Sequence, residues 1–108
     1  MNVEEMKKKL KTYTKDKIIL KEHMLIRCLQ REIKPETIIN QLLNPDNLID
    51  IIEQEAKYSG EKKYKLIFEL SRNKNFIIII SINKTINIVT ALIRYRKWFR
   101  SIELRERR

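Results

Sequence analysis

Asn75-Phe76-Ile77-Ile78-Ile79-Ile80-Ser81-Ile82 is the stretch of sequence that decides the fold. Phenylalanine and β-branched isoleucine occupy both sets of alternating positions, and these residue types favour strands. A strand that is apolar on both faces is typical of the interior of a sheet, where neighbouring elements cover it. The sequence therefore predicts that residues 75–82 form a central β-strand.

Further strands are predicted on both sides of this stretch. Residues 63–71 alternate in polarity, and one face carries Tyr64, Leu66, Phe68 and Leu70. After residue 82, Asn83-Lys84 predicts a two-residue hairpin turn, because asparagine accepts the positive φ that such turns need. Residues 85–94 then form the last strand. Residues 48–55 are compatible with a helix or a strand, and their β-branched residues favour the strand.

The N-terminal half predicts helices instead. Asn2 and Glu5 have the spacing of a capping box, which predicts a helix over residues 3–13. A short strand at residues 17–20 precedes a helix over residues 22–32, whose apolar stripe consists of Met24, Leu25, Cys28 and Leu29. Pro35 begins another helix, over residues 35–43, and Asn44-Pro45-Asp46 ends it.

Together these elements predict an α+β fold. We expect two or three N-terminal helices packed on one face of a three- to five-stranded, mainly antiparallel sheet, with the other face open. The length of 108 residues fits a single domain. Its expected parts are an N-terminal helix at residues 1–16, a core at 17–95 and a basic tail at 96–108.

Positive charge is concentrated at the two ends of the chain, whose net charge is +10. Residues 1–17 hold six lysines and three acidic residues, and residues 94–108 hold seven basic residues and two glutamates. Like charges crowd together at an energetic cost unless a partner neutralises them, so the pattern favours nucleic acid as the partner. An acidic partner protein, or basic ends that are simply solvated, are the alternatives.

Several functional classes fit the composition poorly. With one cysteine and one histidine the chain offers neither a disulfide nor a cysteine- or histidine-rich metal site, and its single glycine excludes a glycine-rich nucleotide loop. We expect no metal and no cofactor. The longest apolar run is far shorter than the roughly 20 residues that span a bilayer, and the N-terminus is rich in lysine. A cytoplasmic protein without a membrane partner is therefore expected.

His23, Arg27 and Arg31 recur every fourth residue along one side of a predicted helix. Histidine exchanges protons near neutral pH, and arginine binds phosphate through paired N–H groups. These residues are the candidate catalytic group, and RNA cleavage fits them because the substrate's own 2′-hydroxyl supplies the nucleophile. The alternative is that His23 braces the start of the helix and that both arginines are solvated.

A second candidate group surrounds the end of the last strand, where aromatic and basic side chains are interleaved. Bases stack on aromatic rings while cations neutralise phosphates, so this pattern is typical of nucleic-acid binding. The alternative role for its tryptophan is a core contact. The candidate nucleic-acid-binding residues are Arg94, Tyr95, Arg96, Lys97, Trp98 and Arg100, and Thr90 lies just before them.

The order of these motifs resembles an uncharacterised family of small prokaryotic proteins. The resemblance covers residues 17–98 and is carried by Ile18-Ile19-Leu20-Lys21-Glu22-His23, Arg27, Arg31-Glu32-Ile33, Pro35-Glu36-Thr37-Ile38, Asn44-Pro45-Asp46, and Thr90 followed by basic and aromatic residues. That family is similar in layout to the RelE/ParE-like toxins, many of which are ribonucleases held in check by an antitoxin.

The resemblance implies a RelE-like fold, a toxin-like, metal-independent endoribonuclease and an acidic antitoxin as partner. A shared fold does not transfer chemistry, so a non-catalytic nucleic-acid-binding protein with basic termini remains the alternative. The sequence leaves open whether the chain is an enzyme, whether RNA or DNA is bound, and whether it forms a homodimer.

Overall fold

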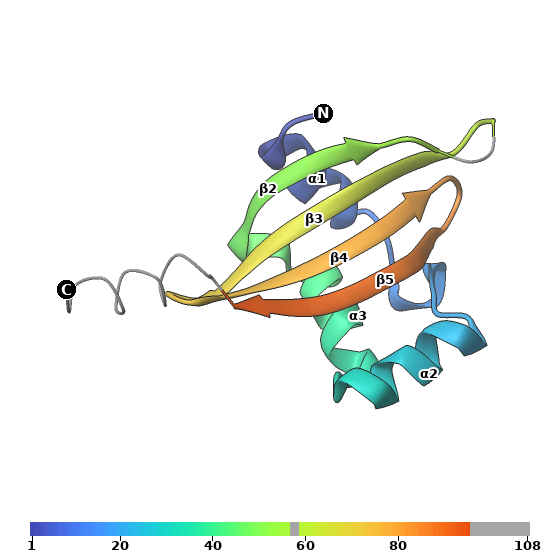
Figure 1. Ribbon diagram of the computed structural model, residues 1–108. Helices are drawn as coiled ribbons and strands as arrows, with labels where there is room; N and C mark the ends of the chain where they lie inside the picture. The colour runs from blue at the N-terminus through green and yellow to red at the C-terminus, as the bar shows by residue number, and fades with distance from the viewer. Residues whose placement is uncertain (57–58, 96–108) are drawn as a thin grey trace.

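The computed structural model describes residues 1–56 and 59–95 as three α-helices, two short 3₁₀-helices and one five-stranded sheet (Figure 1). The class is α+β, and all three α-helices precede the sheet's four long strands, as the sequence predicts. In chain order the elements are α1 (Val3–Leu10), η1 (Lys15–Lys17), β1 (Ile18–Ile19), α2 (Glu22–Arg31), α3 (Pro35–Leu43), η2 (Pro45–Asn47), β2 (Leu48–Gln54), β3 (Lys62–Ser71), β4 (Lys74–Ile82) and β5 (Ile86–Tyr95).

The isoleucine-rich strand β4 lies at the centre of the sheet, whose order is β1-β5-β4-β3-β2. Strands β2 to β5 form an antiparallel meander, which confirms that part of the prediction and shows that residues 48–54 are a strand. Strand β1 instead pairs in parallel with β5, through Ile18 opposite Ile86 and Ile19 opposite Asn87. The sheet is therefore mixed, and the expectation of antiparallel pairing was incomplete at this edge.

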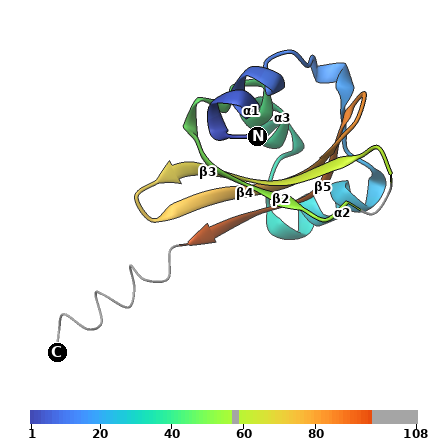
Figure 2. The ribbon, with the colours of Figure 1, turned by 90° about the horizontal axis from the view of Figure 1, so that it is seen from above.

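One face of the sheet carries the hydrophobic core. Helices α1 and α3 lie against this covered face (Figures 1 and 2). Met6 and Leu10 of α1 and Ile38 and Leu42 of α3 are fully buried there. From the strands, the core receives alternate residues, including Leu66, Phe68, Phe76, Ile78 and Ile80. Packing of the two helices against these side chains excludes water from the covered face.

The opposite face, here called the outer face, has no helix across it in the described part of the chain (Figure 1). Cross-strand pairing and the alternation of side chains define its members. The centre of this face is shielded from water as well. Ile77 of β4 is only 2% exposed, although it does not belong to the core cluster on the covered face. The outer face comprises Asp50, Ile52, Lys63, Lys65, Ile67, Asn75, Ile77, Ile79, Ser81, Asn87, Thr90, Leu92 and Arg94.

Helix α2 flanks the β5 edge of the sheet instead of lying on the covered face with α1 and α3 (Figure 1). Its predicted apolar stripe is only half buried as a consequence. Met24 and Cys28 join the core, while Leu25 is 42% exposed and Leu29 is 81% exposed. A helix at a sheet edge contacts its neighbours along a narrower stripe than a helix lying on a face.

The ends of the helices follow the local sequence closely. In the capping box of α1, Glu5 N donates to Asn2 Oδ1 and Asn2 N donates to Glu5 Oε1, both at 2.8 Å. The helix ends at Leu10, three residues earlier than the sequence predicts.

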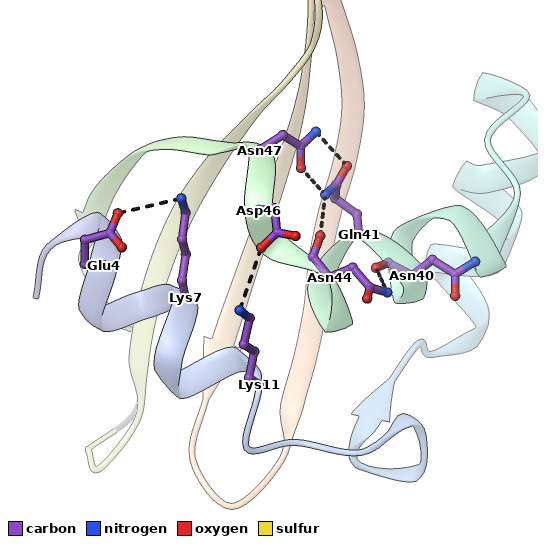
Figure 3. Close-up of polar contacts among 8 residues, drawn as sticks. All are labelled: Glu4, Lys7, Lys11, Asn40, Gln41, Asn44, Asp46 and Asn47. Atoms are coloured by element: carbon purple, nitrogen blue, oxygen red, sulfur yellow. Dashed lines mark hydrogen bonds and ion pairs between the residues drawn. The ribbon is translucent and has the colours of Figure 1, made fainter.

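Helix α3 ends where Asn44-Pro45-Asp46 predicts, and polar side chains hold this corner (Figure 3). Asn44 Nδ2 donates to Asn40 O at 3.0 Å, and Asn47 Nδ2 donates to Gln41 Oε1 at 3.3 Å. Asn47 Nδ2 also donates to Glu69 O at 2.7 Å, which ties the corner to the end of β3. Nearby, Lys11 of the α1 C-terminus forms an ion pair with Asp46 at 3.7 Å.

The β4–β5 turn differs from the prediction. Ile82 pairs with Ile86, so the turn contains three residues, and Asn83 does not adopt a positive φ. Asn83 Oδ1 instead accepts a hydrogen bond from Thr85 N at 3.0 Å. Asparagine side chains often accept a hydrogen bond from the backbone N–H two residues later. Here this bond stabilises a three-residue turn in which Asn83 does not need a positive φ.

Glu32, which caps the C-terminus of α2, is the one non-glycine residue with positive φ in the described part of the chain (φ 55°, ψ 41°). A side chain in the left-handed region costs about 1–2 kcal/mol, and glycine avoids this cost. We predict that Glu32→Gly raises the free energy of unfolding by about 0.5–1 kcal/mol, measured by urea denaturation. Glu36→Gly, in the first turn of α3 where the backbone is helical, is the matched control and should lower it. A destabilising Glu32→Gly would contradict the account of this corner.

Candidate functional site on the outer face

Two of the sequence-predicted candidate groups meet at the β5 edge. His23, Arg27 and Arg31 are all exposed on α2. Arg31 Nη1 donates to Thr90 Oγ1 at 3.0 Å and to the backbone oxygen of Ala91 at 2.8 Å. The arginine at the end of the helical stripe therefore contacts the threonine that precedes the second group.

These bonds give Arg31 a structural role. Strand β1 covers the β5 edge only opposite Ile86 and Asn87, so the carbonyl of Ala91 receives a side-chain donor in place of a strand neighbour. Hydrogen bonds from a charged donor are stronger than neutral ones. Arg31 fastens α2 to β5, and this contact sets the position of the rest of the helix, including His23.

A hollow of about 710 Å³ lies at the other end of α2, where the outer face meets the β1–α2 connection and the β4–β5 turn. Of the candidate residues that the sequence predicts, only the single histidine, His23, lines it. Its lining residues are Ile19, Lys21, His23, Glu61, Lys63, Ser81, Asn83, Thr85, Asn87, Ile88 and Val89.

Hydrogen bonds fix the polar wall of this hollow. Ser81, only 6% exposed, donates from Oγ to Glu61 Oε2 at 2.8 Å. In the turn, Asn87 Nδ2 donates to Thr85 Oγ1 at 3.3 Å, in addition to the bond that Asn83 receives from Thr85. Polar groups held by such bonds need little reordering when a ligand binds.

A β-bulge shapes the side of the hollow that faces α2. Ile79 pairs with Thr90 and Ile80 with Ile88, so Val89 has no residue opposite it. A bulge bends its strand and redirects the neighbouring side chains, and bulges are frequent beside functional sites. Val89 is 37% exposed and lines the hollow together with His23.

The positive charges of the chain fall into separate regions. Most of the N-terminal lysines belong to α1 and η1, and α1 lies on the covered face (Figure 2). On the outer side, Lys21, His23 and Lys63 line the hollow, and Lys65 lies beyond it on β3. The two ion pairs between described residues join Lys7 to Glu4 and Lys11 to Asp46, so neither neutralises the cations of the hollow.

The second candidate group is only partly within the described residues. Arg94 and Tyr95 are exposed at the end of β5, and Lys74 Nζ lies 5.8 Å from the centre of the Tyr95 ring. This cation–π contact occupies one face of the ring. Arg96, Lys97, Trp98 and Arg100 lie outside the described residues.

Two buried groups with shifted pKa values lie away from the hollow. Burial raises the pKa of the Cys28 thiol, partly offset by the charge of Arg31. Burial also raises the pKa of the Tyr64 phenol, and the nearby Glu53 adds to this effect. Both side chains belong to the core, where the neutral form is favoured.

Within residues 1–56 and 59–95, no group of three or more histidine, cysteine, aspartate or glutamate side chains could hold a metal ion. No helix in this part of the chain is long and apolar enough to cross a membrane. Comparisons of the chain with protein-family models, with curated proteins and with solved structures find no match.

Sequence reasoning found His23 but missed the residues that surround it. Lys21, Glu61, Lys63 and Asn87 come from four separate segments, and only the folded sheet brings them together. Two signals were present in the sequence: lysines at alternate positions of β3, and Ser81 interrupting the isoleucines of β4.

Because Arg31 fastens α2 to the sheet edge, we predict that Arg31→Ala lowers the free energy of unfolding by about 1 kcal/mol, the usual value of such hydrogen bonds at a partly exposed site. Arg27→Ala is the matched control on the same helix and should change stability by less than about 0.5 kcal/mol. Chemical denaturation of both variants measures the difference. Equal stabilities would show that the Arg31 bonds contribute nothing.

Proposed function

We propose that the protein binds RNA on its outer face and cleaves it in the hollow without a metal ion. The observation that carries this proposal is the gathering of the single histidine with Lys21 and Lys63 in one hollow on the uncovered side of the sheet. A proton-exchanging group beside two cations is what phosphodiester cleavage through the 2′-hydroxyl requires.

In this proposal the chemistry is divided among the residues of the hollow. His23 acts as acid or base, taking the proton of the 2′-hydroxyl or giving one to the leaving 5′-oxygen. Lys21 and Lys63 neutralise the charge that develops on the phosphate oxygens. Glu61, whose Oε2 accepts a hydrogen bond from Ser81 Oγ at 2.8 Å, takes the complementary proton-transfer step as the carboxylate of the hollow.

The rest of the outer face supplies the RNA-binding surface. Lys65 and Arg94 offer charge to the backbone phosphates. Arg27 lies between His23 and Arg31 on the helix, where it extends this surface along the β5 edge. Arg96, Lys97, Trp98 and Arg100 remain candidate contacts by their residue types.

The toxin-like part of the proposal is supported by the sequence resemblance over residues 17–98 to a family similar in layout to RelE/ParE-like toxins. The order of N-terminal helices followed by a sheet is compatible with it. An acidic antitoxin is the corresponding partner, and the net charge of +10 would attract such a protein. Dimerisation of this chain is a further alternative.

A second candidate function is nucleic-acid binding without catalysis. It is favoured by the positions of Arg27 and Arg31, which do not line the hollow, and by the bonds of Arg31 to Thr90 and Ala91. In this case the cations hold phosphates and His23 only braces the start of α2.

Incubation with end-labelled single-stranded RNA in EDTA separates the two functions. We predict cleavage products with 2′,3′-cyclic phosphate ends, and a loss of at least about 100-fold in cleavage rate for His23→Ala with little change in RNA affinity. Gln30→Ala, an exposed substitution on the same helix, is the matched control and should retain the native rate.

Intact RNA that is retained on a gel, with affinity falling steeply as salt rises, would support the non-catalytic function and exclude the enzyme. Cleavage that persists in His23→Ala would remove His23 from the mechanism. Absence of binding to RNA and to DNA of the same length would exclude both functions.

A further inference from the structure

We propose that the hollow holds one unpaired nucleotide, with its phosphate against Lys21, Lys63 and His23. This inference rests on the RNA-binding part of the proposed function and adds the class of substrate: single-stranded RNA, with one nucleotide inserted between the outer face and the start of α2. None of the lysines or amides involved was part of the sequence-predicted site.

The size and position of the hollow suit such a ligand. Its volume of about 710 Å³ falls within the range of pockets that enclose small organic molecules. Three separate segments enclose it: the β1–α2 connection with Lys21, the start of β3 with Lys63, and the β4–β5 turn with Asn83. An opening bounded on three sides admits one residue of a chain more readily than the side of a duplex.

Two lysines and one carboxylate, Glu61, line the hollow, and the resulting excess of positive charge favours a phosphate. Lys21 comes from the β1–α2 connection and Lys63 from β3. Neither ammonium group takes part in an ion pair between described residues. Lys21 is also the residue before the first turn of α2, and its side chain makes no capping bond to that turn. The uncapped backbone N–H groups at the helix start add to the positive potential that the two lysines create.

The amide side chains of the turn suit the edge of a base. Asn83 uses its Oδ1 to accept from Thr85, and Asn87 uses its Nδ2 to donate to Thr85. The Nδ2 donors of Asn83 and the Oδ1 acceptor of Asn87 take no part in those bonds. A paired donor and acceptor is what recognition of the hydrogen-bonding edge of an unstacked base needs.

Pairing and stacking explain the preference for a single strand. A base enters the hollow only after it leaves the stack, and in a duplex this also breaks a base pair at a cost of a few kcal/mol. A single strand lacks the pairing cost, so the same contacts give a larger net affinity. A duplex would contact the outer face through its phosphates and leave the hollow empty.

Calorimetric titration of the intact chain with the four ribonucleoside 3′-monophosphates tests the inference. We expect at least one of them to bind, and the corresponding nucleoside without phosphate to bind at least about tenfold more weakly, which corresponds to 1.4 kcal/mol. Lys63→Met should weaken nucleotide binding by at least about tenfold.

Lys62→Met is the matched control, because Lys62 is the neighbouring lysine on β3, is exposed, and does not line the hollow. It removes the same charge from the chain and should leave nucleotide affinity within about twofold of native. Equal losses in both variants would show a general effect of net charge and would overturn the inference.

The test also separates this inference from the proposed function. If RNA is bound or cleaved while no mononucleotide binds or competes, the single-nucleotide site is wrong and the RNA-binding function stands. If mononucleotides bind with the Lys63 dependence while RNA remains intact, the site stands and catalysis is excluded. Equal affinity for a hairpin duplex and a single strand of the same length would overturn the preference for unpaired RNA.

Discussion

The structure depends on one constraint, which is that β4 carries large apolar side chains on both faces but receives helices on only one. Phe76, Ile78 and Ile80 belong to the same buried core as Met6 and Leu10 of α1 and Ile38 and Leu42 of α3. Ile77 points to the other face and is still only 2% exposed. The outer face is therefore dry at its centre and polar around it, and it remains open to a ligand. Every functional proposal made above uses this uncovered face.

Much of the fold followed from local sequence. The isoleucine run placed β4 at the centre, and Pro35 with Asn44-Pro45-Asp46 bounded α3 correctly. The local sequence did not predict which strands pair with each other over long distances in the chain. The parallel contact of Ile18 with Ile86 joins residues far apart in the chain, so no periodicity predicts it. Helix α2 lies at the sheet edge against β5. This position leaves Leu29 exposed where the helical pattern predicted a buried side chain.

For the candidate site, too, local sequence predicted single residues but not the long-range pairing that brings them together. His23 was identified because it is the only histidine, but its partners Lys63 and Asn87 join it only through the pairing of β3, β4 and β5. Arg31, which was expected to hold phosphate, donates hydrogen bonds to Thr90 and Ala91, and no local pattern predicts these contacts. The sequence placed the positive charge at the two ends of the chain. Most of the N-terminal lysines belong to the layer of α1, so the outer face carries a smaller and more local positive charge.

Mapping the bound RNA by nuclear magnetic resonance tests the central claim most directly. The ¹⁵N-labelled chain would be titrated with a short single-stranded RNA, and the backbone amide shifts recorded. Binding at the outer face predicts that the largest changes fall on the strand ends around the hollow, at Lys63, Ser81 and Asn87, and on the start of α2. Changes confined to α1 and its lysines, with the hollow unaffected, would contradict the account.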